Sequence, residues 1–155
     1  MNKNNKSKKY NHISIIGNGE DWDEKKIKDY CKVSDFIIAA DNGLSVLDEL
    51  NITPNLIIGD LDSVPEKILV KYKKIPLERY AKEKDLTDSE ISLQKAISLK
   101  PKKISLLAMT GTYFDHSLAN ILNLYRNYVP NIETEVITHN ATIFPITSKR
   151  ESNSK

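Results

Sequence analysis

The segment Pro54-Asn55-Leu56-Ile57-Ile58-Gly59-Asp60-Leu61-Asp62-Ser63 decides which fold we expect. Its apolar centre, residues 56–58, predicts a short buried strand that runs through Gly59 straight into two aspartates. Alternate residues of an extended chain lie on one side, about 6–7 Å apart, so Asp60 and Asp62 can face one small cation. The alternative interpretation is a solvated acidic loop that follows a strand.

Strand-like and helix-like segments alternate on both sides of this segment. The sequence predicts strands at residues 12–16, 36–40, 56–58, 104–109, 135–138 and 142–146, and helices at residues 23–30, 44–50, 65–71, 87–99 and 115–127. Such alternation favours a parallel or mostly parallel sheet covered by helices. The expected fold class is therefore α/β, a three-layer Rossmann-like domain with a mostly parallel sheet flanked by helices.

The length and composition are typical of one globular domain. Of the 155 residues, 39% are hydrophobic and 28% are charged, and a chain of this length can bury its own core. Much of the net charge of +2 comes from lysines in residues 1–10, which we expect to form a disordered basic tail. The rest of the chain is close to neutral, so nucleic acid is not an expected partner.

The cysteine count and the hydropathy of the sequence indicate where in the cell the protein is expected to lie. Cys31 is the only cysteine, which excludes an internal disulfide and a cysteine-based metal cluster and suits a reducing environment. No apolar run approaches the length of a transmembrane helix, and no apolar signal segment follows the basic start. We therefore expect a cytoplasmic protein with no membrane partner.

Five aspartates follow predicted strands or open predicted helices: Asp41, Asp60, Asp62, Asp88 and Asp115. In a parallel sheet these positions converge on the edge where the strands end, and open α/β sheets bind their ligands there. Carboxylates gathered at one edge repel one another unless a cation or a metal–polyphosphate complex lies between them. Mg²⁺ is usually held by one or two carboxylates together with substrate phosphates. The sequence therefore predicts a magnesium and phosphate site at this edge.

The predicted helix at residues 87–99 begins with a capping box. In Thr87-Asp88-Ser89-Glu90, Thr87 is expected to cap the helix and Glu90 to reach back to the cap amide. That role explains Thr87 and Glu90 and leaves Asp88 favoured by the helix dipole. Lys84, just before the box, fits either a solvated loop or a contact with phosphate.

Asp115 and His116 stand at the start of the next predicted helix. A lone histidine there is more often a capping or packing residue than a general base. Asp115 is the better candidate for chemistry, because a carboxylate beside a substrate hydroxyl can orient it or accept its proton.

Several nucleotide-binding and metal-binding motifs are absent from the sequence. The chain has no G-x-x-x-x-G-K-[ST] run, and Gly17-x-Gly19 lacks the third glycine of the dinucleotide fingerprint. It also has no H-E-x-x-H run and no cysteine–histidine ligand spacing. These absences exclude a P-loop enzyme and the common zinc sites.

Four blocks occur in an order that is specific. They are Ala39-Ala40-Asp41-Asn42-Gly43, the PNLIIGDLDS segment at residues 54–63, Lys84-Asp85-Leu86-Thr87-Asp88, and GTYFDHSLANI at residues 111–121. This series resembles the catalytic domain of the thiamine pyrophosphokinases. The resemblance covers residues 12–140, and it places the catalytic α/β domain at residues 11–140.

The resemblance implies transfer of a pyrophosphoryl group from ATP to the hydroxyl of thiamine, giving thiamine pyrophosphate and AMP. It implies Mg²⁺ held by Asp60, Asp62 and Asp88, with Asp41 and Asp115 also lining the active site. It further implies contacts to ATP or its phosphates from Lys84, Thr87, Gly111 and His116. The partners expected from it are ATP, thiamine and a second subunit in a homodimer.

Three departures from the family pattern bear on activity. Tyr113 stands where the family usually has an arginine, whose bidentate phosphate contact tyrosine cannot replace. The family's Asp-Gly-Gly-Ala-Asn block here reads Asp-Asn-Gly-Leu-Ser, at residues 41–45. The family also carries a C-terminal β-sandwich. Residues 141–155 are expected to be either a remnant of that second domain or a disordered tail. These departures predict impaired activity.

Other functions are weighed against this one. Related domains act on a pterin alcohol, so the same site with a different acceptor is one alternative. A truncated nucleotide-binding remnant without catalysis is another. A phosphatase of the haloacid dehalogenase type, with its first aspartate as nucleophile, is weaker, because its later lysine and acid pair have no clear counterpart here.

Overall fold

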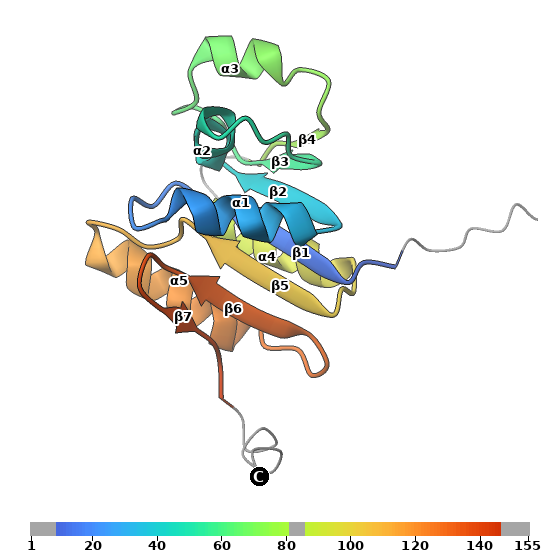
Figure 1. Ribbon diagram of the computed structural model, residues 1–155, viewed down its shortest axis with the longest axis vertical. Coiled ribbons are helices and arrows are strands. Elements are labelled where there is room, and N and C mark those ends of the chain that lie inside the picture. Colours follow the sequence, from blue (N-terminus) through green and yellow to red (C-terminus); the bar gives the residue numbers. More distant parts are fainter. Residues whose placement is uncertain (1–8, 81–85, 147–155) are drawn as a thin grey trace, which may run out of the picture.

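The structure is a computed structural model that describes residues 9–80 and 86–146. Seven strands form one sheet in the order β4-β3-β2-β1-β5-β6-β7 (Figure 1). The strands are β1 (His12–Ile16), β2 (Phe36–Ala40), β3 (Leu56–Ile58), β4 (Leu77–Glu78), β5 (Lys103–Leu107), β6 (Glu133–Ile137) and β7 (Thr142–Ile143). The helices are α1 (Glu24–Val33), α2 (Gly43–Glu49), α3 (Glu66–Lys71), α4 (Asp88–Ser98) and α5 (Phe114–Arg126).

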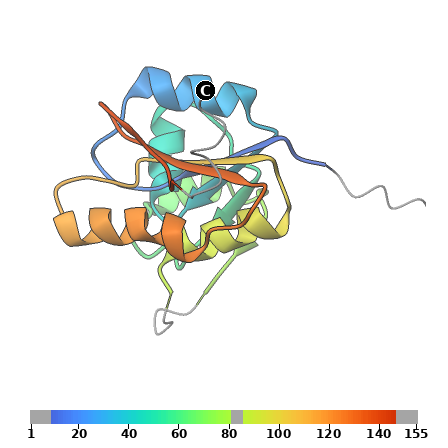
Figure 2. The same ribbon diagram turned by 90° about the horizontal axis from the view of Figure 1, so that it is seen from below.

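The sheet lies between two layers of helices. Helix α1 crosses in front of the strands in Figure 1, and α4 and α5 lie behind them, as the view from below in Figure 2 also shows. One core packs α1, α2 and α3 on the first face of the sheet, with Ile27, Leu44 and Ile68 among its members. The second core packs α4 and α5 on the other face, with Leu93 and Leu124 among its members.

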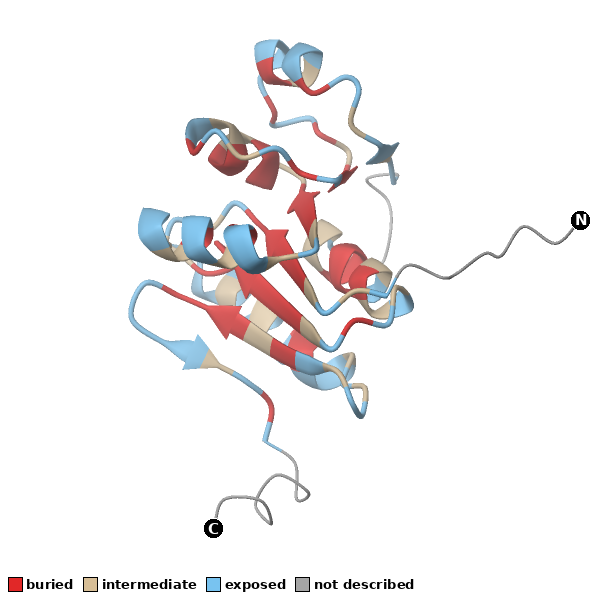
Figure 3. Cartoon of the chain, turned by 45° about the vertical axis from the view of Figure 1, so that its right-hand side comes forward, coloured by how far each residue is buried: buried red, intermediate tan, exposed pale blue. Residues whose placement is uncertain are grey.

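The central strands are buried on both faces, as their continuous apolar sequences predict. Ile13 and Ile15 of β1 belong to the core under α4 and α5, whereas Ile16 belongs to the core under α1. β1 pairs in parallel with both β2 and β5, and Figure 3 shows the buried residues concentrated in these central strands. The predicted α/β fold with a mostly parallel sheet is confirmed.

The structure differs from the predicted elements mainly at the sheet edges. β4 was not predicted, because its two residues are too few to give a periodic pattern. β7 pairs antiparallel with β6 in the same sheet, with Ile137 opposite Thr142. Pro65 is the cap of α3 instead of its first residue. Most of the predicted basic tail lies outside the described residues. Of the helices in the described ranges, none is long and apolar enough to cross a membrane.

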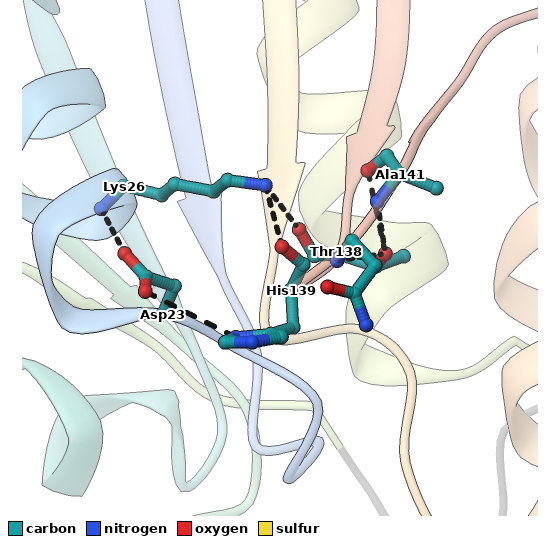
Figure 4. Close-up of polar contacts among 6 residues, drawn as sticks. Asp23, Lys26, Thr138, His139 and Ala141 are labelled. Atoms are coloured by element: carbon teal, nitrogen blue, oxygen red, sulfur yellow. Dashed lines mark hydrogen bonds and ion pairs between the residues drawn. The ribbon is translucent and has the colours of Figure 1, made fainter.

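The turn between β6 and β7 is tied to the start of α1 (Figure 4). Lys26 Nζ donates hydrogen bonds to the carbonyl oxygens of Thr138, at 3.1 Å, and His139, at 2.7 Å. Asp23 caps α1 through its Oδ1, which accepts from Lys26 N at 2.8 Å, and its Oδ2 lies 3.9 Å from His139 Nδ1. These contacts fix the edge of the sheet from which the chain continues beyond β7.

Cys31 gives a prediction about the packing of α1. Its side chain is buried, and this burial raises the pKa of the Cys31 thiol to about 12. Because the thiolate is the reactive form, we expect native protein at pH 8 to react with a disulfide reagent at least about 10³-fold more slowly than unfolded protein, whose thiol pKa is near 8.5. Following the colour released by the reagent with and without urea checks this. Fast reaction of the native protein would mean that α1 is not packed as described.

Candidate active site

A cavity of about 380 Å³ opens where β1, β2 and β5 end. Its walls come from the segments after these strands and from the first turns of α4 and α5. The lining residues are Gly17, Asn18, Gly19, Glu20, Ala40, Asp41, Thr87, Asp88, Ser89, Ala108, Met109, Thr110, Gly111, Tyr113, His116, Ser117 and Asn120. The cavity thus gathers segments that are up to about a hundred residues apart in the chain.

The topology of the sheet explains why the cavity lies there. From β1 the chain builds outward through β2, β3 and β4, and it then returns to place β5 on the other side of β1. The connections after β1 and β5 therefore leave in opposite directions and open a crevice at the carboxyl ends of the strands. Open α/β sheets bind ligands at such a point.

The segments after β1 and β5 are joined by backbone hydrogen bonds. Gly17 N donates to Leu107 O at 2.9 Å, and Gly19 N donates to Ala108 O at 2.7 Å. A side chain at Gly19 has no room, because a Cβ there would lie 2.2 Å from the carbonyl oxygen of Thr110. The two glycines therefore let two backbones meet and shape this wall of the cavity.

Three carboxylates meet beside the cavity, and two of them, Asp41 and Asp88, line it. Asp41, Asp60 and Asp88 each bring one oxygen into a group whose members lie within 4.8 Å of one another. Asp41 follows β2 and has a φ of +48°, which aspartate tolerates better than most residues. Its Oδ1 accepts from Leu61 N at 3.2 Å and its Oδ2 accepts from Ser63 Oγ at 3.3 Å. The turn after β3 thus holds the Asp41 side chain in the group.

The electrostatics of the group favour a cation. Burial raises the pKa of Asp41, and the neighbouring Asp88 and Asp60 carboxylates raise it further, against a lowering by the backbone hydrogen bond from Asn42. The neighbouring carboxylates raise the pKa of Asp41 because their negative charges repel its own, and a bound cation would relieve this repulsion.

The trio fits Mg²⁺. All three donors are hard oxygens, which this ion prefers, and its bond length of about 2.0–2.1 Å puts opposite ligands about 4.2 Å apart. The observed limit of 4.8 Å is slightly wider, so a small side-chain movement brings the three oxygens onto one ion.

Asp62 lies outside this group. The expectation that Asp60 and Asp62 project to the same side assumed an extended chain, but Leu61 has a φ of +64° and turns the backbone between them. Asp62 is exposed, and its backbone N–H donates to Asp60 Oδ1 at 3.0 Å. Asp62 therefore orients Asp60 through its backbone, and a role for its side chain stays a prediction.

The first turns of α4 and α5 face the cavity. Thr87 caps α4, with its Oγ1 accepting from Glu90 N at 3.2 Å. Asn120 of α5 accepts from Ser89 Oγ at 2.6 Å and donates to Met109 O at 2.7 Å, so it ties both helices to the segment after β5. Helix starts with unpaired N–H groups attract anions, and two of them here line the cavity together with Asp41 and Asp88.

The remaining predicted site residues are placed as follows. Gly111 and His116 line the cavity. Asp115 is not among the lining residues, and 81% of its side chain is exposed. Lys84 lies outside the described residues. In the capping box, the Glu90 carboxylate was expected to accept from the backbone N–H of Thr87. It accepts instead from Asn127 Nδ2 at 3.4 Å.

Several lining residues were missed by the sequence analysis. Asn18 and Glu20 follow β1, and Glu20 Oε2 accepts from Thr112 N at 2.9 Å, which lowers the pKa of Glu20. Ser117 and Asn120 lie on the cavity side of α5. The spacing 113, 116, 117 and 120 places four polar or aromatic residues on one side of a helix. This pattern could have indicated that this side of α5 lines a site.

The model for the family "Thiamin pyrophosphokinase, catalytic domain" matches residues 27–136. The chain belongs to this family. A thiamine pyrophosphokinase of Bacillus subtilis is 34% identical over 102 residues, which are 64% of this chain and 48% of that protein. The chain therefore spans about half the length of this curated relative.

Solved structures of family members share the fold. The thiamine pyrophosphokinase of Bacillus subtilis aligns with a TM-score of 0.70 at 26% identity, over 82% of this chain and 60% of its own. That of Geobacillus thermodenitrificans aligns with a TM-score of 0.68 at 28% identity, over 82% and 59%. The enzyme from Candida albicans, at 19% identity and a TM-score of 0.71 over 87% and 60%, shows the same fold. The family resemblance read from the four blocks is confirmed.

Proposed function

We propose that this protein transfers a pyrophosphoryl group from ATP to the hydroxyl of thiamine. The observation that carries the proposal is the trio of Asp41, Asp60 and Asp88 at the rim of a cavity that two helix starts also line, at the switch point of the sheet. The relative from Bacillus subtilis is a thiamine pyrophosphokinase, which supports the choice of acceptor.

The residues divide into two groups, one that would hold the metal ion and one that contacts the phosphate oxygens of ATP. Asp41, Asp60 and Asp88 would hold Mg²⁺ on the triphosphate, and Asp62 is proposed to support them. Mg²⁺ supplies charge neutralisation on the phosphates, which is the main demand of phosphoryl-type transfer. The N–H groups of the first turns of α4 and α5 bind phosphate oxygens, with Thr87, Gly111 and His116 at their sides.

The reaction balances as a single in-line displacement. The thiamine hydroxyl oxygen forms a bond to the β-phosphorus of ATP while the bond from that phosphorus to the oxygen of the α-phosphate breaks. AMP leaves with that oxygen, and the hydroxyl proton is released. The protein contributes positioning and a fixed electrostatic environment, and it forms no covalent intermediate.

Three further proposals accompany the activity. A homodimer is proposed from the resemblance, as is a direct part for Asp115 and Lys84 at the site. A cytoplasmic location is proposed because ATP is the donor and the one cysteine, Cys31, needs no oxidising compartment.

Product analysis tests the proposed activity. The protein is incubated with Mg-ATP and thiamine, with Mg-ATP and a hydroxymethyl pterin, and with Mg-ATP alone, and AMP is measured by chromatography. We expect AMP and thiamine pyrophosphate in equal amounts with thiamine, and no AMP in the other two incubations. AMP formed with the pterin alone would assign a different acceptor. Binding of Mg-ATP with no AMP under any condition would leave a nucleotide-binding protein without this activity.

A further inference from the structure

A second pocket lies at the end of the sheet where α2, β3, α3 and β4 meet (Figure 1). It has a volume of about 250 Å³ and shares no lining residue with the cavity of the candidate active site. Most of its wall is apolar and comes from Leu44, Ile57, Leu61, Leu69, Ile75 and Leu77. We call it the α3 pocket. An apolar pocket with a few polar groups is the usual form of a binding site for a small molecule.

The wall of the α3 pocket is tied together by contacts between its elements. Tyr72 lines the pocket and is 6% exposed, and its hydroxyl donates to Asp48 Oδ1 of α2 at 3.1 Å. Lys71 Nζ donates to the same oxygen at 2.5 Å. On another side, β4 pairs with β3, with Leu77 opposite Ile57. The pocket is therefore bounded by elements that hold one another, as expected of a site formed before its ligand binds.

Two cationic side chains also line the α3 pocket. They are Lys73 and Arg79, and both residues are exposed, so they lie where the pocket opens to solvent. Within the described parts of the chain, neither forms an ion pair, whereas Lys71 nearby is bound to Asp48. The α3 pocket thus combines an apolar wall with two positive charges that no described carboxylate compensates.

The surrounding segment is also rich in positive charge. Residues 66–80 contain five lysines and arginines but only two carboxylates, Glu66 and Glu78. The Glu78 carboxylate is already bound to Lys95, and it accepts from the Tyr80 hydroxyl at 3.1 Å. The whole chain has a net charge of only +2, so this segment is a local concentration of positive charge. Such a concentration attracts anions.

These features are complementary to a small molecule that has an apolar body and one carboxylate. The apolar wall removes the body of such a molecule from water. Lys73 and Arg79 at the opening meet its carboxylate, for which arginine offers two parallel N–H donors. The volume is about eight times that of one water molecule in the liquid, and it lies below that of pockets for drug-sized ligands. The ligand is therefore small, with a body of roughly eight carbon atoms.

We propose that the α3 pocket binds a small apolar carboxylic acid in its ionised form, with the carboxylate at Lys73 and Arg79. The proposal goes beyond the proposed activity and does not depend on it, because the two sites share no residue. They are adjacent through one turn: Leu61 lines the α3 pocket, and its backbone N–H donates to Asp41 Oδ1 at 3.2 Å. A bound acid therefore contacts the turn that holds Asp41.

Nuclear magnetic resonance of the full ¹⁵N-labelled chain tests the ligand class and the place of binding together. Octanoate is expected to shift the amide signals of Leu61, Leu69 and Leu77 and to saturate with a Kd below about 1 mM. Octylammonium has the same apolar body with the opposite charge, and acetate has the same head without the body. Both are expected to bind at least tenfold more weakly than octanoate.

Charge variants test the part of the two cations. The double change Lys73→Gln with Arg79→Gln is expected to raise the Kd for octanoate at least tenfold, because it removes both charges and keeps the length of the side chains. It is expected to leave the Kd for 1-octanol unchanged, since that head carries no charge. Lys32→Gln, at an exposed lysine of α1, is the matched control and is expected to change neither value.

A second variant tests the apolar wall. Leu77→Trp is expected to fill part of the α3 pocket and to weaken octanoate and 1-octanol alike, by at least tenfold. Leu77 is 39% exposed, so we expect the fold to accept the larger side chain. Val33→Trp, at an exposed valine of α1, is the matched control and is expected to bind both ligands as the natural chain does. Circular dichroism checks that all variants are folded.

Three results would overturn the proposal. The first is the absence of saturating shifts with octanoate up to about 10 mM, a range that covers weak ligands. The second is octylammonium binding as tightly as octanoate, or an octanoate affinity that the double charge variant leaves unchanged, because either would mean that the two cations do not recognise the head. The third is octanoate shifts confined to residues of the active-site cavity, such as Gly111 and Ser117.

Discussion

Asp60→Asn is expected to lower the rate of AMP formation by at least about 10³-fold, because phosphoryl-type transfer depends on charge neutralisation at the phosphates. Asparagine has nearly the same shape and keeps an oxygen that can accept the hydrogen bond from Asp62 N. The change therefore removes a charge from the trio while leaving its local contacts in place. Initial rates of AMP release at saturating Mg-ATP and thiamine measure the effect. Asp29→Asn, at a carboxylate of α1 that is 60% exposed, is the matched control and is expected to keep full activity.

The same variant is expected to be at least as stable as the natural chain when no metal is present. The pKa of Asp41 is raised above its ordinary value of 3.8, in part by Asp60. The folded protein therefore holds a proton on Asp41 where the unfolded chain does not, so metal-free stability falls as the pH rises through the raised pKa. Removing the Asp60 charge lessens this fall. Thermal unfolding in EDTA from pH 4 to pH 8 measures it, and an unfolding temperature well below that of the natural chain would mean that Asp60 is structural.

Gly43→Ala is expected to destabilise the fold by about 3 kcal/mol, at the upper end of the usual cost of overpacking. A Cβ at Gly43 would lie 2.0 Å from the carbonyl oxygen of Ile16 and 2.9 Å from that of Gly17. Both neighbours are backbone atoms, so α2 has to move away from β1. For a chain of this length the expected loss corresponds to a fall of about 6–12 °C in the unfolding temperature.

Glu49→Ala in the same helix is the control for Gly43→Ala. Glu49 is exposed, and we expect its replacement to change stability by less than about 0.5 kcal/mol. Alanine also favours helices over glycine by about 1 kcal/mol, so a loss at Gly43 cannot come from helix propensity. An unchanged unfolding temperature for Gly43→Ala would show that α2 does not approach β1 as closely as described.

The fold was largely predictable from local sequence. The strand at Leu56–Ile58 was predicted with its observed bounds, because three β-favouring residues stand between Asn55 and Gly59. Helix α4 was predicted from its cap, Thr87, and its apolar periodicity. β4 was not predictable, since its two residues become a strand only by pairing with Ile57 and Ile58.

The candidate site was predictable in its chemistry and less so in its geometry. Asp41 and Asp60 follow β2 and β3, and Asp88 opens α4. That these three residues come together was predictable from the order of the strands and helices. The side on which Asp62 lies depends on the positive φ of Leu61, which no local pattern indicates for a leucine. Asn120 enters the site through its bonds to Ser89 and Met109, and such contacts between distant segments are not visible in one sequence.

The most direct test of the central claim is the affinity for ATP with and without a divalent ion. Isothermal titration of the natural chain is expected to show ATP binding at least about tenfold more tightly with Mg²⁺ than with EDTA, because without the ion three carboxylates face the triphosphate. In Asp88→Asn we expect this ratio to fall toward one. Equal affinities with Mg²⁺ and EDTA in the natural chain, or an unchanged ratio in the variant, would contradict a shared ion at Asp41, Asp60 and Asp88.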